Sequence, residues 1–88
     1  MEKNFEVGFS DEAINDLKKI DKVERQKILS KLGSLGDFRK NNNVKKLSGD
    51  LSMYYRLRVG KIRVVFEVDE KVKRIKIEYL GFWGSIYR

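Results

Sequence analysis

In the second half of the chain, apolar and polar residues alternate with the two-residue period of β-strands. The alternation covers residues 54–68 with one interruption at 60–61, a glycine followed by a lysine. This pattern predicts a β-hairpin closed by a two-residue turn with glycine first. A second turn at 69–71 leads to another alternating segment, 74–79, which places Tyr79 in the core. The second half therefore predicts a meander of three antiparallel strands.

The predicted turn also fixes which residues face each other across the hairpin. Val59 is expected opposite Ile62 and Arg58 opposite Arg63, with Arg56 on the same face as the two arginines. Like charges directly opposite each other destabilise a β-ladder. Guanidinium groups fit phosphate oxygens well, so we expect this cluster of arginines to bind an anion.

The N-terminal half predicts one strand followed by a helical hairpin. Apolar residues alternate over 5–9, which is typical of a strand with one buried face. Ser10 is expected to cap a first helix and Asp21 a second helix, because both precede apolar residues at helical spacing. The second helix is expected to run to Gly36. Residues 37–43, which include three consecutive asparagines, are expected to form a loop.

The order of these elements predicts an α+β fold. An N-terminal strand and a helical hairpin are expected, the hairpin packed on one face of an antiparallel sheet that the C-terminal three-strand meander completes. The other face of the sheet is expected to stay open. With 88 residues, the chain is expected to form a single domain, residues 1–88.

Charge and composition restrict the possible functions. The chain has a net charge of +7, and most of the excess lies in residues 44–88, which carry 11 basic and 5 acidic side chains. Such a balance favours an anionic partner. Since the chain contains no cysteine and no histidine, thiol nucleophiles, a histidine base and Cys- or His-ligated metals are excluded. No apolar run is long enough for a signal peptide or a membrane span, so we expect a cytoplasmic protein without a membrane partner.

Three segments carry a resemblance to a known family. Residues 46–49 read Lys-Leu-Ser-Gly, residues 54–60 read Tyr-Tyr-Arg-Leu-Arg-Val-Gly, and residues 81–88 read Gly-Phe-Trp-Gly-Ser-Ile-Tyr-Arg. Together with the order of the elements, these segments make the chain similar to the RelE/ParE superfamily of toxins from bacterial and archaeal toxin–antitoxin pairs. The resemblance extends over essentially the whole chain.

The resemblance implies a toxin of a type II toxin–antitoxin system. RelE-like members are ribosome-dependent mRNA endoribonucleases that inhibit translation. Their chemistry needs no metal and no cofactor, because a ribose 2′-OH attacks the adjacent phosphodiester. The implied partners are an acidic, RelB-like antitoxin, the ribosome and mRNA.

The resemblance also implies which residues form the site. Arg56 and Arg58 stand where such toxins often have lysine or arginine, and Arg63 matches a phosphate-binding arginine. Tyr87 matches a C-terminal tyrosine that orients or deprotonates the 2′-OH, so these four are the expected catalytic residues. The expected RNA-binding residues around them are Lys45, Lys46, Tyr54, Lys76 and Arg88.

The chain departs from the family pattern near its C-terminus. Where many relatives have His-Arg, it has Phe82 and Trp83, so a candidate acid/base and a phosphate-stabilising arginine are missing. One of the two aromatic rings is expected to pack and the other is open to base stacking. Two alternatives to an active ribonuclease therefore remain: a ParE-like toxin that inhibits DNA gyrase, and a catalytically degenerate toxin that mainly binds its antitoxin.

Overall fold

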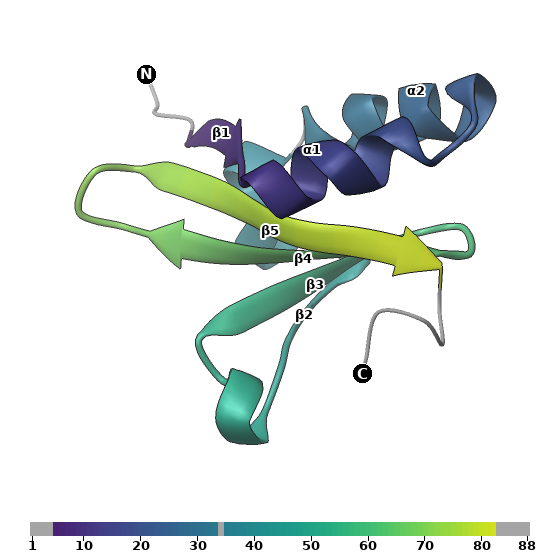
Figure 1. Ribbon diagram of the computed structural model, residues 1–88. Helices are drawn as coiled ribbons and strands as arrows, with labels where there is room; N and C mark the ends of the chain where they lie inside the picture. The colour runs from purple at the N-terminus through teal and green to yellow at the C-terminus, as the bar shows by residue number, and fades with distance from the viewer. Residues whose placement is uncertain (1–4, 34, 83–88) are drawn as a thin grey trace.

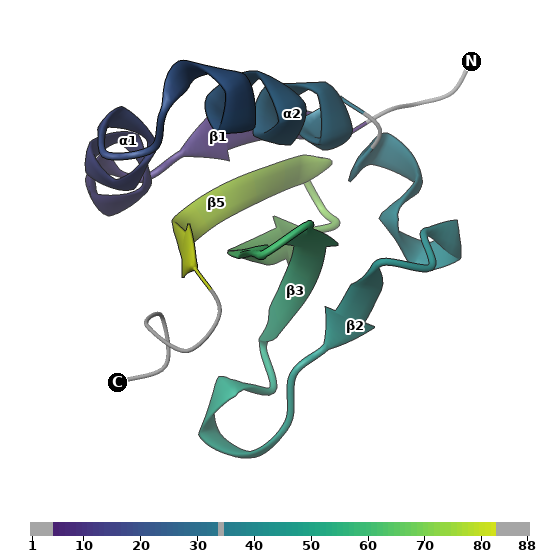
Figure 2. The ribbon, with the colours of Figure 1, turned by 90° about the vertical axis from the view of Figure 1, so that its right-hand side faces the viewer.

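The computed structural model describes residues 5–33 and 35–82, which fold into a five-stranded sheet and helices that cover one of its faces (Figures 1 and 2). The elements are β1 (Glu6–Phe9), α1 (Asp11–Lys18), α2 (Lys22–Leu32), the 3-10 segments η1 (Leu35–Lys40) and η2 (Gly49–Leu51), and strands β2 (Val44–Lys46), β3 (Tyr54–Val59), β4 (Ile62–Asp69) and β5 (Arg74–Phe82). The strands are ordered β1-β5-β4-β3-β2 across the sheet. This arrangement confirms the predicted α+β fold.

The β3–β4 hairpin has the predicted register. Val59 pairs with Ile62 and Arg58 with Arg63. Gly60 occupies the first turn position with φ +60°, a conformation that glycine adopts without steric cost. The turn therefore places two arginines side by side on adjacent strands, as the sequence predicts.

Both predicted helix caps are present. The Ser10 hydroxyl accepts a hydrogen bond from the Ala13 N–H (3.0 Å), and the Asp21 carboxylate accepts one from the Glu24 N–H (2.9 Å). The second helix ends earlier than expected, at Leu32 instead of Gly36.

Side chains of α1 and its cap also form hydrogen bonds with backbone groups on the edge of β5, beyond the point where β1 ends. The Ser10 hydroxyl donates to the Glu78 carbonyl (2.6 Å), and the Asp16 carboxylate accepts from the Leu80 N–H (3.0 Å). An unpaired strand edge would otherwise expose these backbone groups. The first helix is thereby fixed against the sheet, opposite the face that the helices leave open.

The core lies between the helices and the sheet, and it includes a segment that we expected to be a loop. Residues 35–40 form η1, and Phe38 on this segment is 2% exposed. Its ring makes edge-on contacts with Phe5, Tyr55 and Phe66, at centroid distances of 5.6, 5.1 and 6.1 Å. The interpretation of 37–43 as a plain polar loop is therefore wrong for its first part, because one aromatic residue in it is a centre of the core.

Three features of the sheet were not predicted. The first is that β1 pairs with β5 in parallel, so the sheet is mixed and not antiparallel throughout. A short strand, β2, pairs with β3 and extends the meander by one strand. The β4–β5 ladder shifts register between Val65 and Phe66, so that Phe66 pairs with Ile77 but Val65 pairs with Tyr79. This β-bulge moves Tyr79 to the face of Val65, away from the core cluster, so the prediction of a core Tyr79 is wrong.

Candidate functional site

The face of the sheet opposite α1 and α2 carries a group of cations. In the described part of the chain, the helices pack on the side of Leu57, Val64 and Ile75, and no helix covers the other side (Figure 2). We call this other side the arginine face. Since side chains alternate along each strand, its basic residues at the β2–β3–β4 end are Lys45, Arg56, Arg58 and Arg63.

The four cations form two rows across the strands. Lys45 on β2 is directly opposite Arg56 on β3, and Arg58 on β3 is directly opposite Arg63 on β4. Because Arg56 and Arg58 are two residues apart, the rows are separated by about 7 Å. Each row places like charges opposite each other, which costs stability unless an anion lies between them. The rows are therefore suited to two neighbouring phosphate groups.

The arginine side chains are partly immobilised. Arg56 and Arg63 are half-buried, and the Nε atom of each is buried, whereas Arg58 is exposed. An arginine that is fixed at its base loses less side-chain entropy when it binds than a fully mobile one. Arg56 and Arg63 are thus pre-oriented, and Arg58 can adjust to a ligand.

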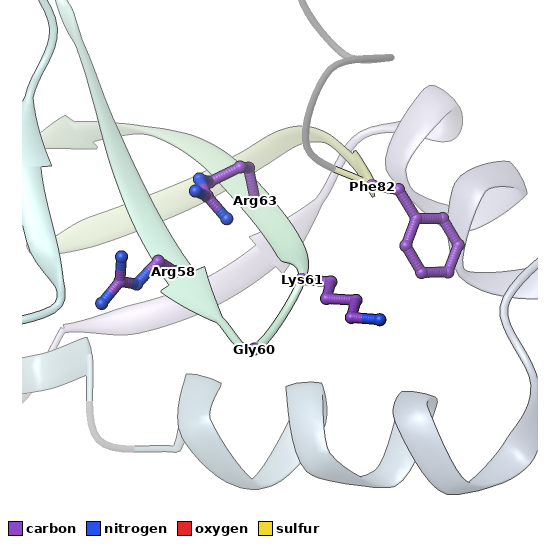
Figure 3. A pocket seen from close by; sticks show the side chains of 5 residues that line it. All are labelled: Arg58, Gly60, Lys61, Arg63 and Phe82. Carbon is purple, nitrogen blue, oxygen red and sulfur yellow. The ribbon is translucent and has the colours of Figure 1, made fainter.

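Two hollows adjoin these cations and share Arg58. The larger, of about 350 Å³, surrounds the end of the hairpin and is lined by Arg58, Gly60, Lys61, Arg63 and Phe82. In Figure 3 the Arg58 and Arg63 side chains lie on one side of the hairpin end, and the Lys61 and Phe82 side chains extend to the other. Phe82 is 50% exposed. Its ring is accessible, but it does not share the side of the guanidinium groups.

The smaller hollow, of about 160 Å³, lies beside β2 and is lined by Asn42, Asn43, Lys45, Arg56 and Arg58. The sequence predicts only a loop for the two asparagines. The run of three asparagines is visible in the sequence, but their proximity to the arginines depends on the pairing of β2 with β3.

The structure places two of the expected RNA-binding residues, Lys45 and Lys46, on opposite faces of the sheet. Lys45 faces the arginine side, whereas Lys46 pairs with Tyr55 and its Nζ lies 5.2 Å from the centroid of the Tyr55 ring, on the helix side of the sheet. Of the two neighbours, only Lys45 lies beside Arg56. The expected RNA-binding role of Lys46 is therefore not favoured by its position.

The other end of the arginine face is acidic and aromatic. Tyr54 and Lys76 both lie opposite Glu67, and the Lys76 Nζ is 4.0 Å from a carboxylate oxygen of Glu78. Glu67 is four residues from Arg63 along β4, which corresponds to about 13 Å. The cations and the carboxylates thus occupy separate ends of one surface, and Lys76 lies at the acidic end.

Glu67 and Glu78 form a carboxyl pair. Partial burial raises the pKa of Glu78 above its ordinary value, and a hydrogen bond with Glu67 raises it further, while the charge of Lys76 acts in the opposite direction. One proton shared between the two carboxyl groups relieves their repulsion. Glu67 lies opposite Tyr54, in the row next to that of Arg56, so the carboxyl pair borders the cations.

Replacement of Glu78 by glutamine is expected to stabilise the protein at pH 7 relative to the wild type. A raised pKa means that the folded state binds the proton more tightly than the unfolded chain, so wild-type stability falls as the pH rises from about 4.5 through the raised pKa. The advantage of Glu78→Gln should therefore shrink as the pH is lowered toward that value. Urea unfolding at several pH values measures this difference. A variant that is less stable at pH 7, by an amount independent of pH, would contradict the assignment.

Part of the expected site lies outside the described residues. Tyr87, Arg88 and Trp83 belong to the segment 83–88, so their placement stays a prediction. Within residues 5–33 and 35–82, no group of three or more metal-ligating side chains is suitably placed for a metal ion. In the same part of the chain, no helix is long and apolar enough to cross a membrane.

Solved structures, unlike sequence comparisons, reveal relatives of this chain. Neither models of protein families nor curated proteins match the sequence. Among solved structures, the RelBE2 toxin–antitoxin complex of Mycobacterium tuberculosis matches with a TM-score of 0.82 and 20% identity, over 91% of this chain and 99% of that chain. The RelE–RelB complex of Pyrococcus horikoshii matches with a TM-score of 0.76 and 28% identity, over 94% and 99%.

The fold is that of the RelE-like toxin superfamily. A third complex of this kind, RelB–RelE of Methanococcus jannaschii, matches with a TM-score of 0.71 and 27% identity, over 90% of this chain and 93% of that chain. The likeness confirms the resemblance that the sequence motifs indicated, and it extends over nearly the whole RelE-like fold.

Proposed function

We propose that this protein is the toxin of a type II toxin–antitoxin system and acts as a ribosome-dependent mRNA endoribonuclease. The observation that carries the proposal is the pair of cation rows on the uncovered sheet face of a RelE-like fold. The toxin role is supported by the similarity to solved RelE–RelB complexes. The reaction is our inference from the residues on this face.

The reaction begins when a ribose 2′-oxygen attacks the adjacent phosphorus. A bond forms between the 2′-oxygen and phosphorus, the bond to the 5′-oxygen breaks, and the products are a 2′,3′-cyclic phosphate and a 5′-hydroxyl. Arg58 and Arg63 hold the phosphoryl oxygens, where negative charge accumulates in the transition state. Arg56 and Lys45 form the second row and hold the next phosphate along the strand.

Proton transfer requires a group other than arginine, whose pKa lies above about 12. Tyr87 is proposed to orient or deprotonate the 2′-OH, as its match to the family motif implies. The 2′-OH loses one proton and the 5′ leaving oxygen gains one from solvent water, so the reaction releases no net proton. The ribosome presents the mRNA in this mechanism, so the proposed location of the protein is the cytoplasm.

An acidic antitoxin is the proposed partner in the resting state. The C-terminal half of the chain is strongly basic, and a disordered acidic segment that folds on the toxin would neutralise it. The antitoxin would release the toxin only when it is itself removed.

Expression of the chain alone is expected to arrest growth, and co-expression with its antitoxin is expected to restore it. Purified toxin should then cleave mRNA on programmed ribosomes, with a 2′,3′-cyclic phosphate at the new end and with no loss of activity in EDTA under conditions that keep ribosomes intact. Growth measurements and mapping of the cleavage products test the two parts separately.

Each contrary outcome has a distinct meaning. Growth arrest without cleavage, together with inhibited DNA supercoiling, would indicate a gyrase inhibitor. Normal growth with soluble, folded protein that still binds an antitoxin would indicate a degenerate toxin, as Phe82 and Trp83 in the C-terminal motif suggest. Cleavage that is lost in EDTA would contradict the metal-free mechanism.

A further inference from the structure

The hollow beside β2 contains two residues to which the proposed mechanism gives no role, Asn42 and Asn43. Three of its lining residues are the cations Lys45, Arg56 and Arg58, and the other two are Asn42 and Asn43, so none of the five is acidic. Its volume of about 160 Å³ leaves room for several water molecules. A phosphate group with part of its nucleotide fits such a space.

Backbone hydrogen bonds fix the asparagine turn against β3. The Asn43 carbonyl accepts from the Arg58 N–H (3.0 Å), the Asn41 side chain accepts from the Asn43 N–H (2.9 Å), and the Asn41 carbonyl accepts from the Val44 N–H (3.1 Å). Asn41 thus builds the turn with its own side chain. The side chains of Asn42 and Asn43 are exposed at the hollow, and neither residue has a positive φ.

An asparagine amide carries both donors and an acceptor, which is the equipment needed to contact a base edge or a ribose hydroxyl. The cations beside it have no such selectivity, because phosphate contacts position a nucleic acid whereas base contacts specify it. The hollow therefore combines a positioning half, Lys45 with Arg56 and Arg58, and a recognising half, Asn42 with Asn43.

We propose that this hollow is the subsite for the nucleotide adjoining the cleaved linkage, with its phosphate on Lys45, Arg56 and Arg58 and its base or ribose on Asn42 and Asn43. This inference rests on the proposed ribonuclease function. Arg58 lines both hollows and is exposed, so it bridges the two phosphates. The separation of the two cation rows, about 7 Å, is comparable to that between successive phosphates of an extended strand. The RNA strand then runs along β3, past the asparagine turn.

Two neighbouring lysines provide the matched test of the positioning half, whose cations are proposed to bind the phosphate. The concentration of toxin giving half-maximal single-turnover cleavage on programmed ribosomes is measured between low and moderate salt. Lys45→Gln removes one phosphate contact and should reduce the slope of log affinity against log salt by about 0.7. Lys46→Gln makes the same change in charge on the opposite side of the sheet and should leave the slope unchanged.

The double variant Asn42→Ala/Asn43→Ala tests the recognising half. Two lost hydrogen bonds should weaken ribosome affinity roughly tenfold. The salt slope should stay that of the wild type, because amides release no counterions. The cleavage rate at saturating toxin should change less than about twofold, since neither residue belongs to the Arg58–Arg63 row. Asn15→Ala, an exposed asparagine on α1, is the control.

Several results would overturn the subsite. Equal salt slopes for Lys45→Gln and Lys46→Gln would contradict the role of the positioning half. Unchanged ribosome affinity in the Asn42→Ala/Asn43→Ala variant would contradict the role of the recognising half. If these variants weaken the complex with the antitoxin but not binding to ribosomes, the hollow is a protein contact instead. In each of these cases the wild type still cleaves, so the proposed function stands. A wild type that neither binds nor cleaves on ribosomes refutes the proposed function and the subsite together.

Discussion

Arg63→Lys is expected to lower the cleavage rate on programmed ribosomes by about 10²–10³-fold, the typical cost of one lost donor at a preorganised site. The substitution keeps the positive charge but removes the planar fork that can hold two phosphoryl oxygens at once. Binding to ribosomes should change little, because binding depends mainly on net charge. The loss should therefore appear in the rate at saturating toxin and not in the affinity.

The matched control for this variant is Arg74→Lys on β5. The Arg74 side chain is 59% exposed and lies 3.6 Å from the Glu6 carboxylate, at the opposite end of β5 from the hairpin turn. The Arg74→Lys variant should cleave mRNA at the wild-type rate. Formation of the antitoxin complex by both variants checks that each is folded. A wild-type rate for Arg63→Lys would mean that Arg63 is not the residue that stabilises the transition state.

The same like-charge pairs that suit phosphates also repel each other in the free protein and lower its stability. Arg58 is the direct cross-strand partner of Arg63, and Lys45 is the direct cross-strand partner of Arg56. An anion that binds between these cations reduces the repulsion within the pairs. Anion binding on this face therefore stabilises the folded protein. An acidic antitoxin and an RNA strand would compete for the same cations. This competition gives a physical reason why a toxin of this type is inactive in its antitoxin complex.

The local parts of the fold could be predicted from the sequence because short-range chemistry determines them. The caps at Ser10 and Asp21 depend on a side chain and a backbone N–H three residues apart. The hairpin register follows from one glycine at the turn, which alone places Arg58 opposite Arg63. For this reason the arginine pair follows from the amino-acid sequence alone.

Features that depend on distant segments could not be predicted in this way. The bulge that moves Tyr79 out of the core is a property of the β4–β5 pairing. The division of Lys45 and Lys46 between two faces depends on the pairing of β2, a strand of three residues that carries almost no periodic signal. The role of the asparagines follows from that same pairing. The Tyr87 assignment rests on the family motif alone.

Phe38 is the clearest case of a long-range feature hidden in a polar segment. Its neighbours in the sequence are glycine, aspartate, arginine and lysine, so no periodicity marks it as a core residue. In the folded protein its ring lies among three other aromatic rings, from the N-terminal segment, β3 and β4. It connects the segment before β2 to the centre of the sheet, and its contribution should be large.

Phe38→Ala is accordingly expected to destabilise the protein by about 3–5 kcal/mol, through lost burial and the cavity left behind. This cost is a large part of the roughly 5–15 kcal/mol that keeps a typical domain folded. Urea unfolding of the isolated variant, or of its antitoxin complex if the free chain does not fold, measures it. Phe82→Ala makes the same chemical change at a ring that is 50% exposed and should cost about 1 kcal/mol or less. If the two substitutions cost the same, Phe38 is not the packing centre that its three ring contacts indicate, and β2 with its asparagine turn must be held in place by the β3 ladder alone.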